Sequence, residues 1–194
     1  MAKSQINDRA LVPLFHCLDR DGEPFDSSDF KRKRNLVIYF LTHPSLDVPR
    51  PENCVLQGAD MLWPLGHPDF RAKGIPGFSP GWLHFLLSLE QAQRLMREQN
   101  AEVLVVTRRS VGEIQNLHSQ HRLTYRILSD EHKDVFKKFI QVADQEEVAA
   151  LFVTDKFGEV FFQYFAADVV DLPPFSDVVQ SLAFIESQCP ECGD

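Results

Sequence analysis

The sequence predicts an α/β fold in which a central mixed sheet carries helices on both faces. Three short apolar runs, at 36–41, 102–107 and 150–155, have the pattern of strands that are covered on both sides. Segments with helical spacing of apolar residues alternate with these runs, and this alternation implies right-handed crossovers. The 194 residues exceed the common size of one domain but are short for two, so we expect a single domain over 1–194.

The first part of the chain predicts two strands. Residues 11–18 have a β-like pattern, and 19–22 (DRDG) supply the turn that ends it. The run 36–41 (LVIYFL) is the best candidate for the central strand. The basic run Lys31–Arg34 directly precedes it, and we interpret this run as a solvated turn rather than a nucleic-acid or membrane patch.

Helix starts are marked by capping patterns. The segments 88–91 (SLEQ) and 110–113 (SVGE) both have the capping-box pattern, and each precedes apolar residues at helical spacing. Ser129 is expected to cap a third helix, and a final helix is expected over 175–187, after two prolines. The runs 150–155 and 159–166 predict a hairpin that closes through a glycine turn.

Composition limits the partners of the chain. The formal net charge of -8 argues against binding to a phosphate backbone, so we expect no nucleic-acid partner. No stretch of about 18 apolar residues occurs, and residues 1–10 lack the apolar stretch of a signal peptide, so we expect a cytoplasmic protein without a membrane segment. Four cysteines in a reducing compartment favour free thiols, metal ligands or redox groups over structural disulfides.

Six short segments of the chain stand in a recognisable order and spacing: 18–22, 28–31, 35–41, 103–107, 125–130 and 151–158. The order of the predicted elements resembles the thioredoxin fold, and these segments resemble the peroxiredoxin, alkyl hydroperoxide reductase and thiol-specific antioxidant (redoxin) family. The resemblance covers about residues 10–187, with an insertion at 43–88. It implies a thiol-dependent oxidoreductase that acts on a peroxide or on a protein thiol or disulfide, and it leaves a homo-oligomer open.

The family's chemistry needs a thiolate near the start of the helix after the central strand, where the helix dipole stabilises the negative sulfur. This sequence instead has 42–45 (THPS) where peroxiredoxins show Thr-x-x-Cys. Cys54 follows a few residues later, with Pro51 in place of the family's threonine and with Glu52, which would raise a thiol pKa. The arginine that peroxiredoxins place before the late strand is also missing from 147–151.

The insertion 43–88 is rich in proline and aromatic residues, so we expect loops with short helical turns that cross the site region. It is interpreted either as a lid packed on the sheet edge or as a surface for a partner or ligand. Its three histidines, His43, His67 and His84, lack a metal-binding spacing such as His-x-x-x-His.

The tail 188–194 carries the most pointed chemistry, because Cys189 and Cys192 form a Cys-x-x-Cys pair. The pair can close a small disulfide ring and exchange it with a partner, or provide half of a zinc site, or be a plain exposed end. The preceding helix end and the acidic residues Glu186 and Glu191 should raise the pKa of both thiols, which suits a resolving or electron-relay pair better than primary attack on peroxide.

Two functional hypotheses follow. The first is a redoxin-type thiol oxidoreductase in which Cys189 and Cys192 carry electrons and Cys54 is the candidate primary thiol; it needs no cofactor. The second is a catalytically degenerate redoxin domain that acts as a binding or assembly module, with zinc bound by the tail cysteines in one version. Cys17 lies in the first predicted strand and is interpreted as a small buried hydrophobic residue in both cases.

Overall fold

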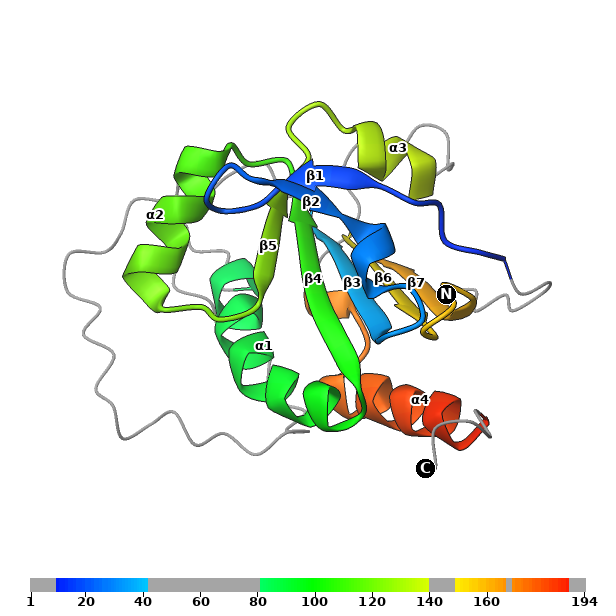
Figure 1. Cartoon of the computed structure of the whole chain (residues 1–194). Helices are drawn as coiled ribbons and strands as arrows, with labels where there is room; N and C mark the ends of the chain where they lie inside the picture. Colours follow the sequence, from blue (N-terminus) through cyan, green and yellow to red (C-terminus); the bar gives the residue numbers. More distant parts are fainter. Residues whose placement is uncertain (1–9, 42–80, 140–148, 167–168, 189–194) are drawn as a thin grey trace, which may run out of the picture.

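A mixed sheet of seven strands organises the part of the chain that the computed structural model describes, residues 10–41, 81–139, 149–166 and 169–188 (Figure 1). The strand order is β2-β1-β5-β4-β3-β6-β7. Strands β3, β4 and β5 are parallel, whereas β1, β6 and β7 pair in antiparallel fashion with their neighbours. The strands are β1 (His16–Leu18), β2 (Pro24–Asp26), β3 (Asn35–Leu41), β4 (Ala101–Thr107), β5 (Arg126–Ser129), β6 (Ala149–Thr154) and β7 (Val160–Ala166). The helices are α1 (Gly81–Glu98), α2 (Val111–His121), α3 (Asp134–Phe139) and α4 (Phe175–Gln188), with short 3-10 turns at Ser27–Phe30 and Val169–Asp171.

The central strand β3 is buried on both faces, as its continuous apolar run predicts. Its side chains alternate between two apolar clusters. Val37, Tyr39 and Leu41 point toward α1, α2 and α4, and Ile38 and Phe40 point toward α3 and the β1–β2 hairpin. Figure 1 shows α3 near β1, apart from α1 and α4. The prediction of a mixed sheet with helices on both faces is therefore confirmed.

Several predicted elements agree closely with the structure. The runs 36–41, 102–107 and 150–155 form most of β3, β4 and β6. The β6–β7 hairpin closes at Gly158, whose φ of +87° lies in the left-handed region that favours glycine. The final helix, predicted over 175–187, is α4.

The sheet has more strands than the sequence predicts. The predicted strand at 11–18 is shorter, since only His16–Leu18 is regular and Leu11 forms an isolated bridge to Glu159. Strands β2 and β5 were not predicted as strands, because they span three and four residues and are too short to display a periodicity.

Two predicted helix starts are wrong. Ser88 lies within α1, which begins at Gly81, because the buried apolar positions continue upstream to Trp82 and Leu86. Residues 81–88 of the predicted insertion are therefore helical. Ser129 does not cap α3 but belongs to β5, and the carboxylate of Asp130 accepts hydrogen bonds from the first helical amides instead.

Candidate functional site

The candidate site lies where the parallel strands β3 and β4 end. Both strands run in the same direction, with Leu41 paired with Thr107 at their carboxyl ends. Helix α1 precedes β4 through a short connection and so starts at this same edge, and α2 begins just after β4. Figure 1 shows α1 running from this edge back to the first residue of β4. The positive ends of two helix dipoles therefore lie at the edge where open α/β sheets bind ligands.

Arg109 places a guanidinium group at this edge. Its side chain is only 11% exposed, and it lies over the ring of Trp82, with 5.3 Å between the guanidinium carbon and the ring centroid. Arg109 Nη1 contacts Glu113 Oε1 at 2.8 Å. The hydroxyl of Ser129 donates to the carbonyl oxygen of Arg109 at 2.6 Å and so ties its backbone to β5. A cation–π contact and an ion pair thus fix this arginine.

The capping box of α2 holds the arginine in position. Ser110 Oγ accepts from the Glu113 amide at 3.5 Å, and one Glu113 oxygen accepts from both the Ser110 amide and the Ser110 hydroxyl at 2.9 Å. The other oxygen binds Arg109. These hydrogen bonds, the backbone one most of all, lower the pKa of Glu113, and the Arg109 charge lowers it further. The carboxylate therefore stays ionised and keeps its partners at neutral pH.

Two buried donors near the start of α1 have no hydrogen-bond partner among the described residues. They are the indole N–H of Trp82 and the hydroxyl of Tyr39. Tyr39 is fully buried and packs edge-on against Phe85, one helical turn from Trp82. Burial raises the pKa of Tyr39, so its hydroxyl remains a donor. Both donors are closed to solvent, so Arg109 is the group at this edge that favours an anion, such as a thiolate or an oxyanion.

Cys17, the one cysteine among the described residues, is not part of this edge. It lies in β1 on the opposite face of the sheet, is 8% exposed, and belongs to the cluster around Phe15 and Phe40. Burial raises the pKa of its thiol to about 12, and the Asp130 charge adds to this increase against the opposing effect of Lys138. The prediction that Cys17 is a small buried hydrophobic residue is confirmed.

The other predicted site residues, Cys54, Cys189 and Cys192, lie outside the described residues. The described elements that precede these cysteines in the chain limit where they can lie. Helix α4 ends at Gln188, so the tail pair follows the carboxyl end of a helix, as predicted.

The end of α4 lies at the opposite edge of the sheet from Arg109. Asn35, the first residue of β3, donates from Nδ2 to Glu186 Oε1 at 2.6 Å and so anchors the last turn of α4. Six residues of β3 follow Asn35 before the strand ends at the carboxyl edge. At about 3.3 Å per strand residue, the two edges are roughly 20 Å apart.

Metal ligands and membrane spans were searched for in the same residues. No three His, Cys, Asp or Glu side chains in the described ranges lie close enough to hold a metal ion. His84 lies in α1, and His43 and His67 fall outside the description. None of the described helices is long and apolar enough to cross a membrane.

Sequence reasoning missed Arg109, Trp82 and Tyr39 as site residues. The signal for Arg109 was present, because the arginine stands directly before the Ser110 capping box and after a buried strand. The signal for Tyr39 was ambiguous, since a tyrosine in an apolar strand is usually a core residue.

Comparison with known proteins identifies the fold. Residues 75–163 match the AhpC/TSA family. The mitochondrial 2-Cys peroxiredoxin of Plasmodium falciparum superposes with a TM-score of 0.64 at 15% identity, covering 94% of this chain and 96% of that one. Peroxiredoxin Q of Xanthomonas campestris gives 0.64 at 15% identity, covering 91% and 98%. The peroxidoxin BcpB of Mycobacterium tuberculosis gives 0.61 at 15% identity, covering 92% and 95%. No curated protein matches this chain.

Proposed function

This chain has the thioredoxin-like fold of the peroxiredoxins and matches the AhpC/TSA family, and from that premise we propose that it is a thiol-dependent oxidoreductase of the redoxin type. Cys189 and Cys192 carry the electrons, and Cys54 is the primary thiol where a peroxide is the substrate. The observation that carries the proposal is the fold together with the family match. Cys17 takes no part, because burial keeps its thiol protonated.

The chemistry balances as two coupled steps. With a disulfide substrate, a tail thiolate attacks one substrate sulfur, the substrate S–S bond breaks, and the other sulfur leaves as a thiolate, which gives a mixed disulfide. The second tail thiolate then attacks the tail sulfur of the mixed disulfide and releases the remaining substrate sulfur as a thiolate, so that the tail is oxidised and the substrate is reduced by two electrons. With a peroxide, the Cys54 thiolate attacks one peroxide oxygen, the O–O bond breaks, and the sulfur becomes a sulfenic acid while the leaving oxygen takes a proton. A tail thiolate of another protein molecule then attacks the sulfenic sulfur, water leaves, and an intermolecular disulfide forms. A dithiol reductant supplies two electrons to restore the thiols.

The carboxyl edge of β3 and β4 supports the peroxide step. Strand β3 ends at Leu41, which pairs with Thr107 two residues before Arg109, and Cys54 lies thirteen positions further along the chain than Leu41. A thiolate at this edge would lie near the Arg109 guanidinium. Such a cation stabilises a thiolate and the oxygen that leaves the peroxide, without any rearrangement at the moment of reaction. Arg109 thus offers a cation on the β4–α2 connection, although the arginine before β6 is missing.

The position of α4 supports a protein partner for the tail pair. Cys192 lies four residues beyond Gln188, so it can extend about 14 Å from the end of α4 at most. The carboxyl edge of the same chain is roughly 20 Å from the anchor at Asn35, across a packed core. The pair is therefore better placed to exchange a disulfide with another protein molecule than with its own Arg109 edge.

A turnover assay with matched cysteine variants tests the proposal. The reduced protein is mixed with hydrogen peroxide or with a small disulfide substrate, and a dithiol reductant recycles it. We expect turnover to be abolished in the double variant Cys189→Ser/Cys192→Ser and unchanged in Cys17→Ala. Loss of the peroxide reaction alone in Cys54→Ser supports its role as the primary thiol. Full turnover in the double variant would contradict the proposal.

Arg109 offers a second, independent test of the peroxide reaction. Arg109→Gln removes the cation and should slow peroxide reduction on the order of ten- to hundredfold, since one charged donor contributes about 1.5–3 kcal/mol. Arg94→Gln is the matched control, because Arg94 is an exposed arginine on α1 that pairs with Glu98. Equal rates in both variants would remove Arg109 from the reaction.

A second candidate function is favoured by one observation. Among the described residues, the first α-helix after β3 is α1, which starts with 81–84 (GWLH) and has no cysteine in its first turn, where the family's chemistry needs one. This observation fits a degenerate redoxin domain that binds or assembles, with zinc held by Cys189 and Cys192 in one version. Zinc that copurifies and is lost in Cys189→Ser/Cys192→Ser, together with absent turnover, would favour this candidate over the first.

A further inference from the structure

An apolar groove of about 170 Å³ lies beside the amino end of β3, between the segment 11–14 and the β6–β7 turn. Leu11, Leu14 and Phe157 line it, and these large apolar side chains are 68%, 54% and 42% exposed. Apolar residues that are exposed singly need no explanation, but three around one concave surface mark an interaction site. Small-molecule sites measure roughly 300–1,000 Å³, so this groove suits an apolar side chain of a protein better than a free ligand.

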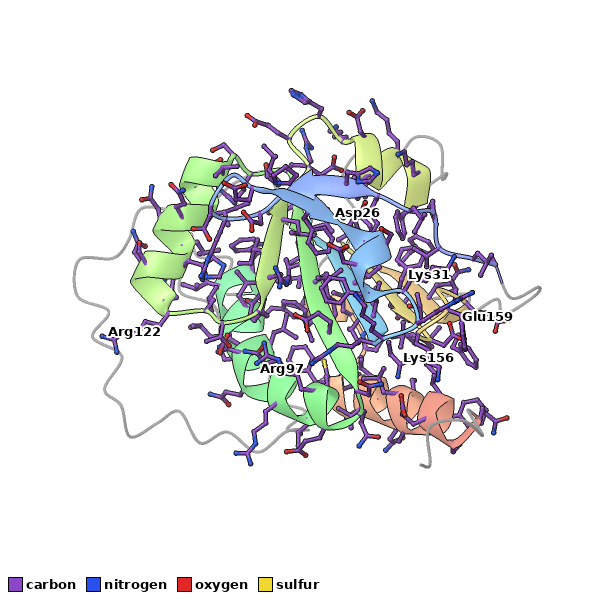
Figure 2. The ribbon with its side chains drawn as sticks, in the orientation of Figure 1. Asp26, Lys31, Arg97, Arg122, Lys156 and Glu159 are labelled. Carbon is purple, nitrogen blue, oxygen red and sulfur yellow. The ribbon has the colours of Figure 1, made fainter. Side chains whose placement is uncertain are left out.

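Cations border this groove. Among the described residues, Lys31, Arg34 and Lys156 line it against one carboxylate, that of Asp155. Asp155 Oδ1 already accepts from two amides of its own turn at 2.8 Å. Figure 2 shows Lys31 and Lys156 on the side of the molecule where α4 ends in Figure 1. The groove therefore combines an apolar centre with a positively charged rim.

The basic turn that ends at Arg34 extends this rim. All four of its side chains, from Lys31 onward, are exposed. Arg34 pairs with Glu102 at 3.5 Å, whereas Lys31, Arg32 and Lys33 form no ion pair with any residue that the structure describes. On a chain of formal net charge -8, three such cations in a row are a local excess of positive charge. This excess attracts an acidic partner and disfavours a basic one.

Backbone hydrogen bonds hold the turn in place. The Arg32 amide donates to the Lys156 carbonyl, and the amides of Lys33 and Arg34 donate to the Phe30 carbonyl at 2.9 and 3.1 Å. The turn is thus tied both to the 3-10 turn before it and to the β6–β7 turn. A partner that binds here need not order this backbone, which lowers the cost of association.

The groove and the turn adjoin the end of α4. Asn35 follows the turn directly, and its Nδ2 donates to Glu186 Oε1 in the last turn of α4 at 2.6 Å. A protein docked on this surface would therefore lie beside the end of the helix that precedes the tail pair. This link to the tail rests on the proposed exchange of a disulfide with another protein, whereas the docking surface itself does not.

We propose that the groove and the turn 31–34 form one docking surface for an acidic segment of another protein. An apolar side chain of that segment fills the groove, and its carboxylates lie against Lys31, Arg32 and Lys33. An apolar centre with a polar rim is the usual layout of a protein interface. A concave apolar surface receives a side chain, whereas binding to a bilayer needs an apolar face that enters the lipid. The shape therefore favours a protein over an anionic membrane.

Calorimetric titration of the full chain carrying Cys189→Ser/Cys192→Ser tests the surface without any thiol chemistry. The probe is a short synthetic peptide of Glu and Asp residues around a central Leu. One companion peptide has Gly in place of Leu, and another has Lys in place of every acidic residue. We expect saturable binding of the probe, binding on the order of tenfold weaker for the Gly peptide because no apolar side chain is buried, and no binding of the Lys peptide.

A charge variant locates the cationic part of the surface. Lys31→Gln/Lys33→Gln should weaken the probe on the order of tenfold, since two ion pairs are lost. Lys137→Gln/Lys138→Gln makes the same change on exposed lysines of α3 and should bind the probe as the parent chain does. Equal affinities in the two variants would overturn the proposal.

An apolar variant locates the groove. Leu14→Ser should lower the affinity for the probe to that for the Gly peptide, and the exposed position of Leu14 spares the core. Leu95→Ser is the matched control on α1, where the side chain is 38% exposed, and should leave the affinity unchanged. Equal loss in both variants, or no saturable binding of the probe to the parent chain, would contradict the proposal.

Two other occupants of the surface are tested by the same titration. A gain in probe affinity on the order of tenfold in a chain that ends at Gln188 would make the tail 189–194 the occupant and would refute a partner protein. Binding to vesicles that contain phosphatidylserine, abolished in Lys31→Gln/Lys33→Gln and accompanied by no binding of the probe, would assign the surface to a membrane and would refute it as well.

Discussion

Three neighbours from three different elements hold Arg109 in place: Trp82 of α1, Glu113 of α2 and Ser129 of β5. The Trp82 ring packs against the guanidinium group, Glu113 forms an ion pair with it, and the Ser129 hydroxyl donates to the backbone carbonyl of Arg109. Each contact arises from an ordinary structural device: a helix start, a capping box and a neighbouring strand. The side chain is nearly buried, so the charge is screened less than a surface charge would be.

Cys17 gives a prediction at the residue scale. Its folded-state pKa of about 12 exceeds its ordinary value of 9.0, so above about pH 9 the unfolded chain loses the proton that the folded chain keeps. The free energy of unfolding should therefore fall as pH rises from about 9 toward about 12, by up to about 1.4 kcal/mol per pH unit from this group. Cys17→Ala should show a shallower fall in denaturant titrations. Parallel slopes for the two proteins would contradict the burial of the thiol.

Ser110 gives a second residue-scale prediction. Ser110→Ala removes the cap of α2 and should lower the free energy of unfolding by about 1 kcal/mol. Ser119→Ala is the matched control on the same helix, because Ser119 donates to the Asn116 carbonyl on an exposed face, and its effect should stay within about 0.5 kcal/mol. Chemical denaturation measures both, and an equal cost would argue against the capping role.

At the residue scale the sequence could predict caps and burial but not the contacts between segments. The Ser110–Glu113 box and the burial of Cys17 depend on local pattern, and both predictions are confirmed. The contact between Trp82 and Arg109 joins two elements, and no spacing rule specifies it. The sequence also could not predict that the Trp82 indole N–H and the Tyr39 hydroxyl have no hydrogen-bond partner among the described residues, because this depends on what surrounds each side chain.

At the scale of elements, the wrong predictions arose where a local sequence signal was outweighed by tertiary packing or was too short to detect. Ser88 has a capping pattern, yet α1 continues through it because the apolar stripe from Trp82 to Met96 packs against the sheet. Tertiary packing of an amphipathic face outweighs a local capping preference of about 1 kcal/mol. Strand β5 was not predicted because it has only four residues, too few to show a periodicity. It is stabilised by pairing with its neighbour β4.

Asp130 gives a prediction at the element scale. Its buried carboxylate accepts from the amides of Val135 at 3.1 Å and Phe136 at 2.7 Å, and so begins α3. Asp130→Ala should lower the free energy of unfolding by about 2–3 kcal/mol, and Asp130→Asn by less, since the amide retains one acceptor oxygen. Asp134→Asn is the control on the same helix, where the side chain is exposed. An Asp130→Ala cost no larger than that of the control would mean that α3 does not depend on this carboxylate.

At the scale of the molecule, the order and type of the main strands could be predicted because buried strands have a distinctive composition. The runs that became β3, β4 and β6 carry most of the sheet, and the thioredoxin-like arrangement follows from their order with the helices. The sequence could not predict that Arg109 and the end of α4 lie at opposite edges of the sheet. Their separation depends on where the last turn of α4 lies in space, not on which residue ends the helix. The bond between Asn35 and Glu186 links residues 151 positions apart.

The central claim is that the tail sulfurs change redox state while Cys17 remains inert. The most direct measurement is intact-mass analysis with thiol alkylation of the reduced chain, before and after one equivalent of hydrogen peroxide or a small disulfide, followed by peptide mapping. The account predicts that Cys189 and Cys192 become unavailable to alkylation and form a disulfide, with a loss of two hydrogens, and that Cys17 is alkylated only after unfolding. Oxidised samples in which Cys189 and Cys192 remain fully alkylated would contradict it.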